Sequence, residues 1–259
     1  MKHIDYILHL ADNALIHGQR IAEWCGHGPV LEEDIAMANI GLDHIGQARM
    51  LYQRAAALTG GDCTEDKLAY FRNPEKFRNL VLLELPHTTA FAPSVKAERD
   101  YAVTIVRNFL YSSFMLLYWH ALQKSSDAQL AAIAAKSLKE VKYHVRHSTD
   151  WIVRLGDGTA ESHTRTQAAL NNLWPYTQEI WVQAAIEEIA HADGTGVDAR
   201  SLQAAWNTSV DTVLLQATLK RPIDGGYMTH GKDGKHSEHL SYLLAEMQSV
   251  ARAHPEAVW

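Results

Sequence analysis

The sequence has few cysteines and no long apolar run. Only Cys25 and Cys63 are cysteines among 259 residues, too few for a disulfide framework, so two reduced thiols are expected. The longest stretch without a charged side chain lies between Arg107 and Lys124. It is shorter than the about 20 apolar residues of a membrane-spanning helix. With no apolar signal-peptide core near residue 1, these absences predict a cytoplasmic protein with no membrane partner.

Positive charge is also scarce. The chain has 24 Lys and Arg against 30 Asp and Glu, a formal net charge of -6. Nucleic acids and anionic membranes attract positively charged surfaces, so general binding to either is not expected. Hydrophobic residues make up 47% and charged residues 21%, a balance typical of globular proteins. The length is ample for one large domain with a closed core.

Helical periodicity dominates the chain, and we find no strand pattern, repeat or linker. A kink at Pro175 is expected in one long segment, and residues 221–235 are expected to form a loop. The predicted helices cover 4–25, 32–58, 65–71, 74–84, 95–123, 127–155, 162–191, 198–221 and 237–253. The chain is therefore predicted to be all-α, an up-and-down bundle with additional helices and a single domain over 1–259.

Local signals refine these helices. The second segment has small residues such as Gly41 and Ala48 on one stripe, which predicts a tight antiparallel hairpin with the first. Asn73 before Pro74 is a typical helix start. Ser126 and Gln129 are predicted to form a capping box at the start of the helix over 127–155.

A bundle of long helices can hold a di-iron site if two helices each supply Glu and two others each supply Glu-x-x-His. Residues i and i+3 lie on one helical face, so both can reach the same metals. No Asp or Glu occurs between Tyr101 and Ser126. The position three after Asp43 is Gly46, and the position three after Glu140 is Tyr143. The chain therefore lacks the regular ligand set, and neither a metal nor a catalytic residue is expected in it.

Polar pairs remain at these places. Asp43 and Gln47 share a helical face, as do Glu140 and His144. They are interpreted as a buried polar network, as the remnant of a lost metal site, or as both. The alternative hypothesis is a di-metal oxidase or ferritin-type protein with the irregular ligand set Asp43, Glu140 and His144.

Three acid-x-x-His matches lie outside the middle of the long helices, where a di-metal site belongs. With 15 His and 30 acidic residues, a few chance matches are expected. The matches are Glu84 with His87, Glu188 with His191, and Asp233 with His236.

The loop over 226–232 matches the first seven positions of a phosphate-binding P-loop. Asp233 follows where Ser or Thr should hold magnesium, and no strand precedes the loop, so a P-loop is rejected. A looser role is open, in which the loop and the next helix start face a partner or the phosphates of an acyl-CoA. Its candidate residues are Lys232, Lys235, His236 and His239. A free-standing acyl-CoA-binding module is the corresponding alternative function.

Several stretches together resemble one known family, and the resemblance runs along the whole chain. They are residues 18–27, 38–43, 46–49, 139–144, 236–240 and 244–248, with Trp259. The family is that of the C subunits (PaaC) of ring-1,2-phenylacetyl-CoA epoxidases, which are bacterial multicomponent monooxygenases.

The resemblance implies a ferritin-like fold and a non-catalytic role. In such enzymes a homologous A subunit holds the di-iron centre and epoxidises the ring of phenylacetyl-CoA. The C subunit pairs with the A subunit and supports its fold and activity. The implied partners are that catalytic A subunit and, beyond it, small accessory and reductase subunits. No cofactor is implied in this chain, and the di-iron centre is expected in the partner.

Overall fold

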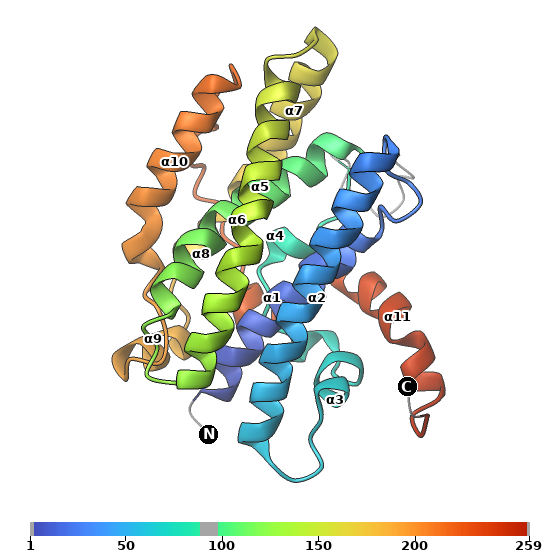
Figure 1. Cartoon of the computed structure of the whole chain (residues 1–259), viewed down its shortest axis with the longest axis vertical. Helices are drawn as coiled ribbons and strands as arrows, with labels where there is room; N and C mark the ends of the chain where they lie inside the picture. Colours follow the sequence, from blue (N-terminus) through green and yellow to red (C-terminus); the bar gives the residue numbers. More distant parts are fainter. Residues whose placement is uncertain (1–2, 89–97, 258–259) are drawn as a thin grey trace. The chain divides into compact units, whose positions relative to one another are not determined.

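The computed structural model describes residues 3–88 and 98–257, and their secondary structure is almost wholly helical (Figure 1). No strand occurs in these two ranges; a single isolated bridge joins His230 and Lys235. The all-α fold class is therefore confirmed, with the paired long helices of a ferritin-like bundle and additional short helices. No described helix has the length and apolarity needed to cross a membrane.

The chain divides into two compact units. The first unit comprises Met1–Leu85 and Thr229–Trp259, and the second comprises Pro86–Met228. The expectation of one domain over 1–259 concerns how these units combine, and it stays a prediction.

The first unit is built on a pair of long helices, α1 (Ile4–Ala22) and α2 (Leu31–Thr59). They run antiparallel, because Asp12 of α1 contacts Tyr52 of α2 whereas Gly18, further along α1, lies beside His44. The other elements of this unit are α3 (Glu65–Tyr70), η1 (Pro74–Lys76), α4 (Val81–Glu84), η4 (Gly231–Asp233) and α11 (Glu238–Ala253).

Small residues bring α1 and α2 close together. A Cβ atom placed on Gly18 would lie 3.0 Å from the Cβ of His44 and 3.2 Å from the carbonyl oxygen of Gly41. Such distances leave almost no room for a methyl group. The predicted tight hairpin is confirmed.

The second unit is also built on an antiparallel pair, α5 (Tyr101–Leu122) and α6 (Ala128–Gly156). The rings of Tyr101 and Trp151 lie 5.7 Å apart, and the hydroxyls of Ser112 and Ser148 are 3.4 Å apart. The remaining elements are α7 (Ala160–Leu173), η2 (Trp174–Thr177), α8 (Gln178–Trp181), α9 (Ala185–Ala192), η3 (Ala199–Leu202) and α10 (Gln203–Gln216).

The prediction of one continuous helix over 74–84 is wrong for residues 77–80. These residues lie between η1 and α4 and are not helical. The N–H of Arg78 donates to the Asp12 carboxylate at 2.8 Å, and the N–H of Leu80 donates to the Asn13 side chain at 2.8 Å. These side-chain acceptors on α1 replace the carbonyls that a helix would have used.

The single kinked helix expected over 162–191 is also wrong. Helix α7 ends at Leu173, and a 3-10 turn containing Pro175 follows, because proline has no N–H to continue the helical ladder. A second break occurs after α8, where Val182 adopts an extended conformation. Several short helices therefore replace one long one.

The expected capping box at the start of α6 is wrong by one residue. Asp127 is the cap, and its carboxylate accepts hydrogen bonds from the N–H groups of Gln129 at 3.0 Å and Leu130 at 3.1 Å. The hydroxyl of Ser126 lies 3.2 Å from that of Thr195 instead. The helix start expected at residue 95, and Trp259, lie outside the described residues.

Candidate functional site

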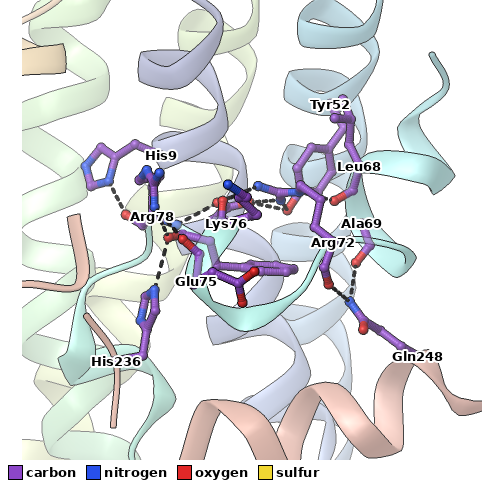
Figure 2. Close-up of polar contacts among 12 residues, drawn as sticks. His9, Tyr52, Leu68, Ala69, Arg72, Glu75, Lys76, Arg78, His236 and Gln248 are labelled. Atoms are coloured by element: carbon purple, nitrogen blue, oxygen red, sulfur yellow. Dashed lines mark hydrogen bonds and ion pairs between the residues drawn. The ribbon is translucent and has the colours of Figure 1, made fainter. Parts of the chain in front are cut away.

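A carboxylate without solvent exposure lies inside the first unit, at Asp12 of α1. It accepts a hydrogen bond from the Tyr52 hydroxyl at 2.5 Å and one from the N–H of Arg78 at 2.8 Å. The guanidinium of Arg72 donates to both carboxylate oxygens. Figure 2 draws Tyr52, Arg72 and Arg78 among the residues of this polar network. Both oxygens of Asp12 are thus engaged by donors of the protein.

Arg72 is held on several sides. Its guanidinium stacks 4.2 Å from the ring centre of Phe77, and it donates to the carbonyl oxygens of Leu68 at 2.5 Å and Lys76 at 3.0 Å. Burial, the largest single effect, would by itself lower the pKa of Arg72, but the charges and hydrogen bonds of Asp12 and Tyr52 together outweigh it and raise that pKa above its ordinary value. Burial, followed by the charge of Asp12, raises the pKa of Tyr52 well above 10.0. The network therefore keeps a cation and a neutral phenol against the carboxylate.

A second buried carboxylate, that of Glu84, holds the start of α11. One of its oxygens lies 3.0 Å from the Asn79 amide nitrogen and 2.9 Å from Nδ1 of His236, and the other accepts from the N–H of Ser237 at 2.5 Å. Nε2 of His236 lies 3.0 Å from the carbonyl oxygen of Phe77. Because both ring nitrogens face oxygen acceptors, the imidazolium form donates to both.

The backbone around Glu84 is fixed as well. The guanidinium of Arg20 on α1 donates to the Glu84 carbonyl oxygen through Nε at 3.0 Å and Nη2 at 2.7 Å. Further along α11, the amide of Gln248 donates to the carbonyl oxygens of Ala69 and Arg72, each at 3.1 Å (Figure 2). These contacts join α4 to α1, and α11 to α3 and the segment that follows it.

The chemistry open to these carboxylates is limited. A metal ligand or general base needs a lone pair that faces a cavity or substrate, and the oxygens of Asp12 and Glu84 accept hydrogen bonds from the protein. Both are therefore structural acceptors that hold the first unit together. The patterns above did not single out Asp12, although an Asp and an Asn within the apolar stripe of the first helix were a usable signal.

The predicted polar remnants fall two in each unit. Asp43 is half-buried and Gln47 is buried, both on α2 of the first unit. Glu140 is half-buried and His144 has no exposed surface, both on α6 of the second unit. A shared network of the four residues depends on how the units combine, so it stays a prediction.

The positions where ligand histidines would be expected do not lie on buried faces. A Cβ on Gly46 would meet no atom within 4 Å, and Tyr143 is 39% exposed. The buried face of α2 instead carries His44, whose ring lies 4.7 Å from that of His17 in an edge-to-face arrangement. His17 and His44 were not among the candidates from the sequence.

The three acid-x-x-His matches lie in different settings. The ring of His236 contacts Glu84, which lies in the same unit, and the carboxylate of Asp233 lies 3.7 Å from the ring of His230. Glu188 and His191 are exposed on α9. In the described ranges, no group of three or more His, Cys, Asp or Glu side chains could hold a metal ion.

The predicted anion-facing loop presents few exposed cations. Lys232 is buried, and His236 contacts Glu84 and Phe77. His239 is half-buried, and Lys235 is exposed. One of the four candidates thus offers an exposed charge, and a role toward a partner or CoA stays a prediction.

The two units thus define an all-α protein of antiparallel long-helix pairs, whose buried acids Asp12 and Glu84 serve as internal acceptors. Residues 1–259 match the family model described as "Phenylacetic acid catabolic protein", so the chain belongs to that family. It is 43% identical over 255 residues to the C subunit of the 1,2-phenylacetyl-CoA epoxidase of Escherichia coli (strain K12), covering 98% of each chain.

Proposed function

We propose that this chain is the non-catalytic structural subunit of a bacterial multicomponent di-iron monooxygenase. The enzyme epoxidises the ring of phenylacetyl-CoA in aerobic phenylacetate degradation, and this chain supports its catalytic A subunit. The observation that carries the proposal is the 43% identity to the C subunit of the E. coli epoxidase over 98% of both chains.

The structure supports a scaffold role through the chemistry of its buried acids. A di-iron centre in a helical bundle uses several carboxylates as ligands. Here Asp12 accepts from Tyr52, Arg72 and Arg78. The residues described within either unit do not fit a di-iron centre, and the proposal derives no chemical step through one. What the chain supplies is a rigid helical surface for another subunit.

The proposal is tested by co-expression with the catalytic A subunit, followed by co-purification, mass analysis and metal analysis. We expect a stable complex of both chains, with iron in the catalytic subunit and less than about 0.1 iron per chain in the structural subunit purified alone. Epoxidation of phenylacetyl-CoA should require the complex to be present. Two irons per chain in the isolated protein would contradict the proposal and support the irregular ligand set Asp43, Glu140 and His144.

Calorimetric titration of the same isolated chain with CoA distinguishes the structural subunit from the alternative, a free-standing acyl-CoA-binding module. Because Lys232 is buried and His236 is engaged by Glu84, we expect no heat of binding from the isolated chain. Saturable binding that is lost in Lys235→Ala would favour a free-standing binding module instead.

A further inference from the structure

Basic side chains gather on the exposed face of α6, in a chain whose overall charge is negative. Residues 136–146 contain four basic residues and one acid, a net charge of +3, against -6 for the whole chain. The four basic residues, which we call the basic stripe, are all exposed, whereas the acid Glu140 is half-buried. At 1.5 Å per residue the stripe is about 15 Å long. Its members are Lys136, Lys139, Lys142 and Arg146.

The spacing within the basic stripe is unfavourable for an isolated helix. Lys139 lies three residues before Lys142, and Arg146 follows Lys142 by four, so like charges are neighbours on one helical face. An exposed helix ordinarily gains stability from opposite charges at these intervals. Within residues 3–88 and 98–257, no ion pair forms at Lys139, Lys142 or Arg146. The helix thus keeps three positive charges whose mutual repulsion lowers its stability.

An aromatic ring lies within the basic stripe. Tyr143 is 39% exposed, and the guanidinium of Arg146 lies 5.7 Å from its ring centre. The ring of the buried His147 lies 6.0 Å from that of Tyr143. Tyrosine and arginine are enriched among the residues that anchor protein–protein contacts. The stripe therefore combines positive charge with an aromatic side chain that its neighbours already hold in place.

The composition of the stripe favours an acidic protein that binds reversibly. Permanent subunit interfaces have a largely apolar centre. Between residues 136 and 146, all of which the structure describes, Tyr143 is the one large apolar side chain on the exposed face. Exposed charges instead attract an oppositely charged partner and raise its association rate. Nucleic acids are also negative, but the net charge of -6 over the chain opposes binding to a long polyanion.

We propose that the basic stripe of α6 is the docking site for an acidic surface of another component of the enzyme, one that binds and leaves, other than the catalytic A subunit. The inference rests on the proposed function, because it takes the chain to be part of a multicomponent enzyme. In this contact, carboxylates of the docking component lie against the ammonium groups of Lys139 and Lys142, and its surface packs on the ring of Tyr143.

Carbodiimide cross-linking tests the contact in the enzyme assembled from all of its co-expressed subunits. The reagent joins a lysine amine to a carboxylate where the two touch, and mass spectrometry identifies both residues. We expect Lys139 and Lys142 to be joined to Asp or Glu of a component other than the A subunit. These products should disappear at about 1 M NaCl, where charges are screened beyond about 3 Å. The exposed Lys220, which follows α10, is the internal control and should give no such product.

The double variant Lys139→Glu/Lys142→Glu separates binding from folding. It should lower the affinity of the purified complex with the A subunit for the cross-linked component by about tenfold or more, because two attractions become repulsions. The isolated variant should unfold at the wild-type temperature or above it, since a carboxylate at position 142 lies four residues before Arg146, a favourable pair. The matched control Lys220→Glu should change the affinity by less than about twofold.

Three results would overturn the proposal. Cross-links that lead from the stripe to the A subunit alone would make it part of the permanent interface. Equal retention of every subunit by the double variant and the wild type across a salt series would show that the stripe docks no component. If CoA alone protects Lys139 and Lys142 from acetylation, the stripe binds phosphates instead of a protein. In each case co-purification with the A subunit still supports the proposed function, whereas a wild-type chain that never co-purifies with it contradicts both.

Discussion

The hydroxyl of Tyr52 on α2 donates a hydrogen bond to the carboxylate of Asp12 on α1, with 2.5 Å between the oxygens and both side chains buried. This bond fixes the register of the hairpin, because it joins one point on each helix. Arg72, which follows α3, completes the contact by donating to the same carboxylate. Three segments that are distant in sequence thus meet at one charge.

Replacing Asp12 by Asn should destabilise the first unit by about 3–5 kcal/mol, because the buried guanidinium of Arg72 loses its anionic partner. Urea unfolding followed by circular dichroism measures the change. Asp62→Asn, at an exposed carboxylate paired with Lys67, is the control and should leave the unfolding midpoint unchanged. Equal stability of Asp12→Asn and the wild type would show that the network contributes little.

Stability should fall as the pH rises above about 10. Burial raises the pKa of Tyr52 and of Tyr111 in the folded chain above 10.0. Above that pH the unfolded chain releases protons that the folded chain retains, so the folded state binds more protons and loses relative stability. Urea midpoints between about pH 8 and 11 measure the slope.

The variant Tyr52→Phe isolates one contribution to this slope. It should be less stable than the wild type at neutral pH by about 1–2 kcal/mol, since a buried hydrogen bond is lost, yet show a shallower fall at alkaline pH. Tyr242→Phe, which removes an exposed phenol on α11, should follow the wild-type curve. An unchanged slope in Tyr52→Phe would assign the alkaline loss to other groups.

Glu84→Gln should release α11 locally. The amide accepts with only one oxygen, so the buried groups at Asn79, His236 and Ser237 can no longer all be satisfied, and the anchor at Ser237 weakens by about 3 kcal/mol. Hydrogen exchange over 238–253 should then accelerate by about a hundredfold. Glu238→Gln, at an exposed acid in the first turn of α11, is the control. Unchanged protection in Glu84→Gln would mean that α11 is held mainly by contacts such as those of Gln248.

Gly18→Ala and Gly46→Ala should have opposite effects. A methyl group at Gly18 meets His44 and the Gly41 backbone, and should cost about 1–3 kcal/mol. At Gly46 it meets open space, and alanine should add about 0.5–1 kcal/mol through helix propensity. Thermal unfolding of both variants and the wild type at one protein concentration gives the comparison. A neutral Gly18→Ala would show that the hairpin can relax at its crossing.

The long helices could be predicted from the sequence because each has an apolar period sustained over many turns. Helix α2 was predicted over 32–58 and is found at Leu31–Thr59. Shorter elements were less predictable, because their ends depend on distant partners. Residues 77–80 leave the helix because Asp12 and Asn13 accept their N–H groups. The local sequence contains no sign of those acceptors.

The candidate site, like the fold, was predictable from the sequence only in part. The irregular metal-ligand pattern was visible in the sequence, since spacing along a helix determines which residues share a face. Which face is buried was not visible. Gly46 and Tyr143 lie outward, whereas His44 and His144 are buried. The partner of His236 was not visible in the sequence either, because Glu84 lies far away along the chain.

The sequence by itself determined the all-α class, the long helices, the tight hairpin and the family resemblance, because periodicity and side-chain size act locally along the chain. Only the tertiary structure decided that Asp12 and Glu84 are internal acceptors and that Lys232 is buried. These properties depend on which distant groups meet a side chain, and burial makes an unpaired polar group costly. A local pattern cannot supply that information.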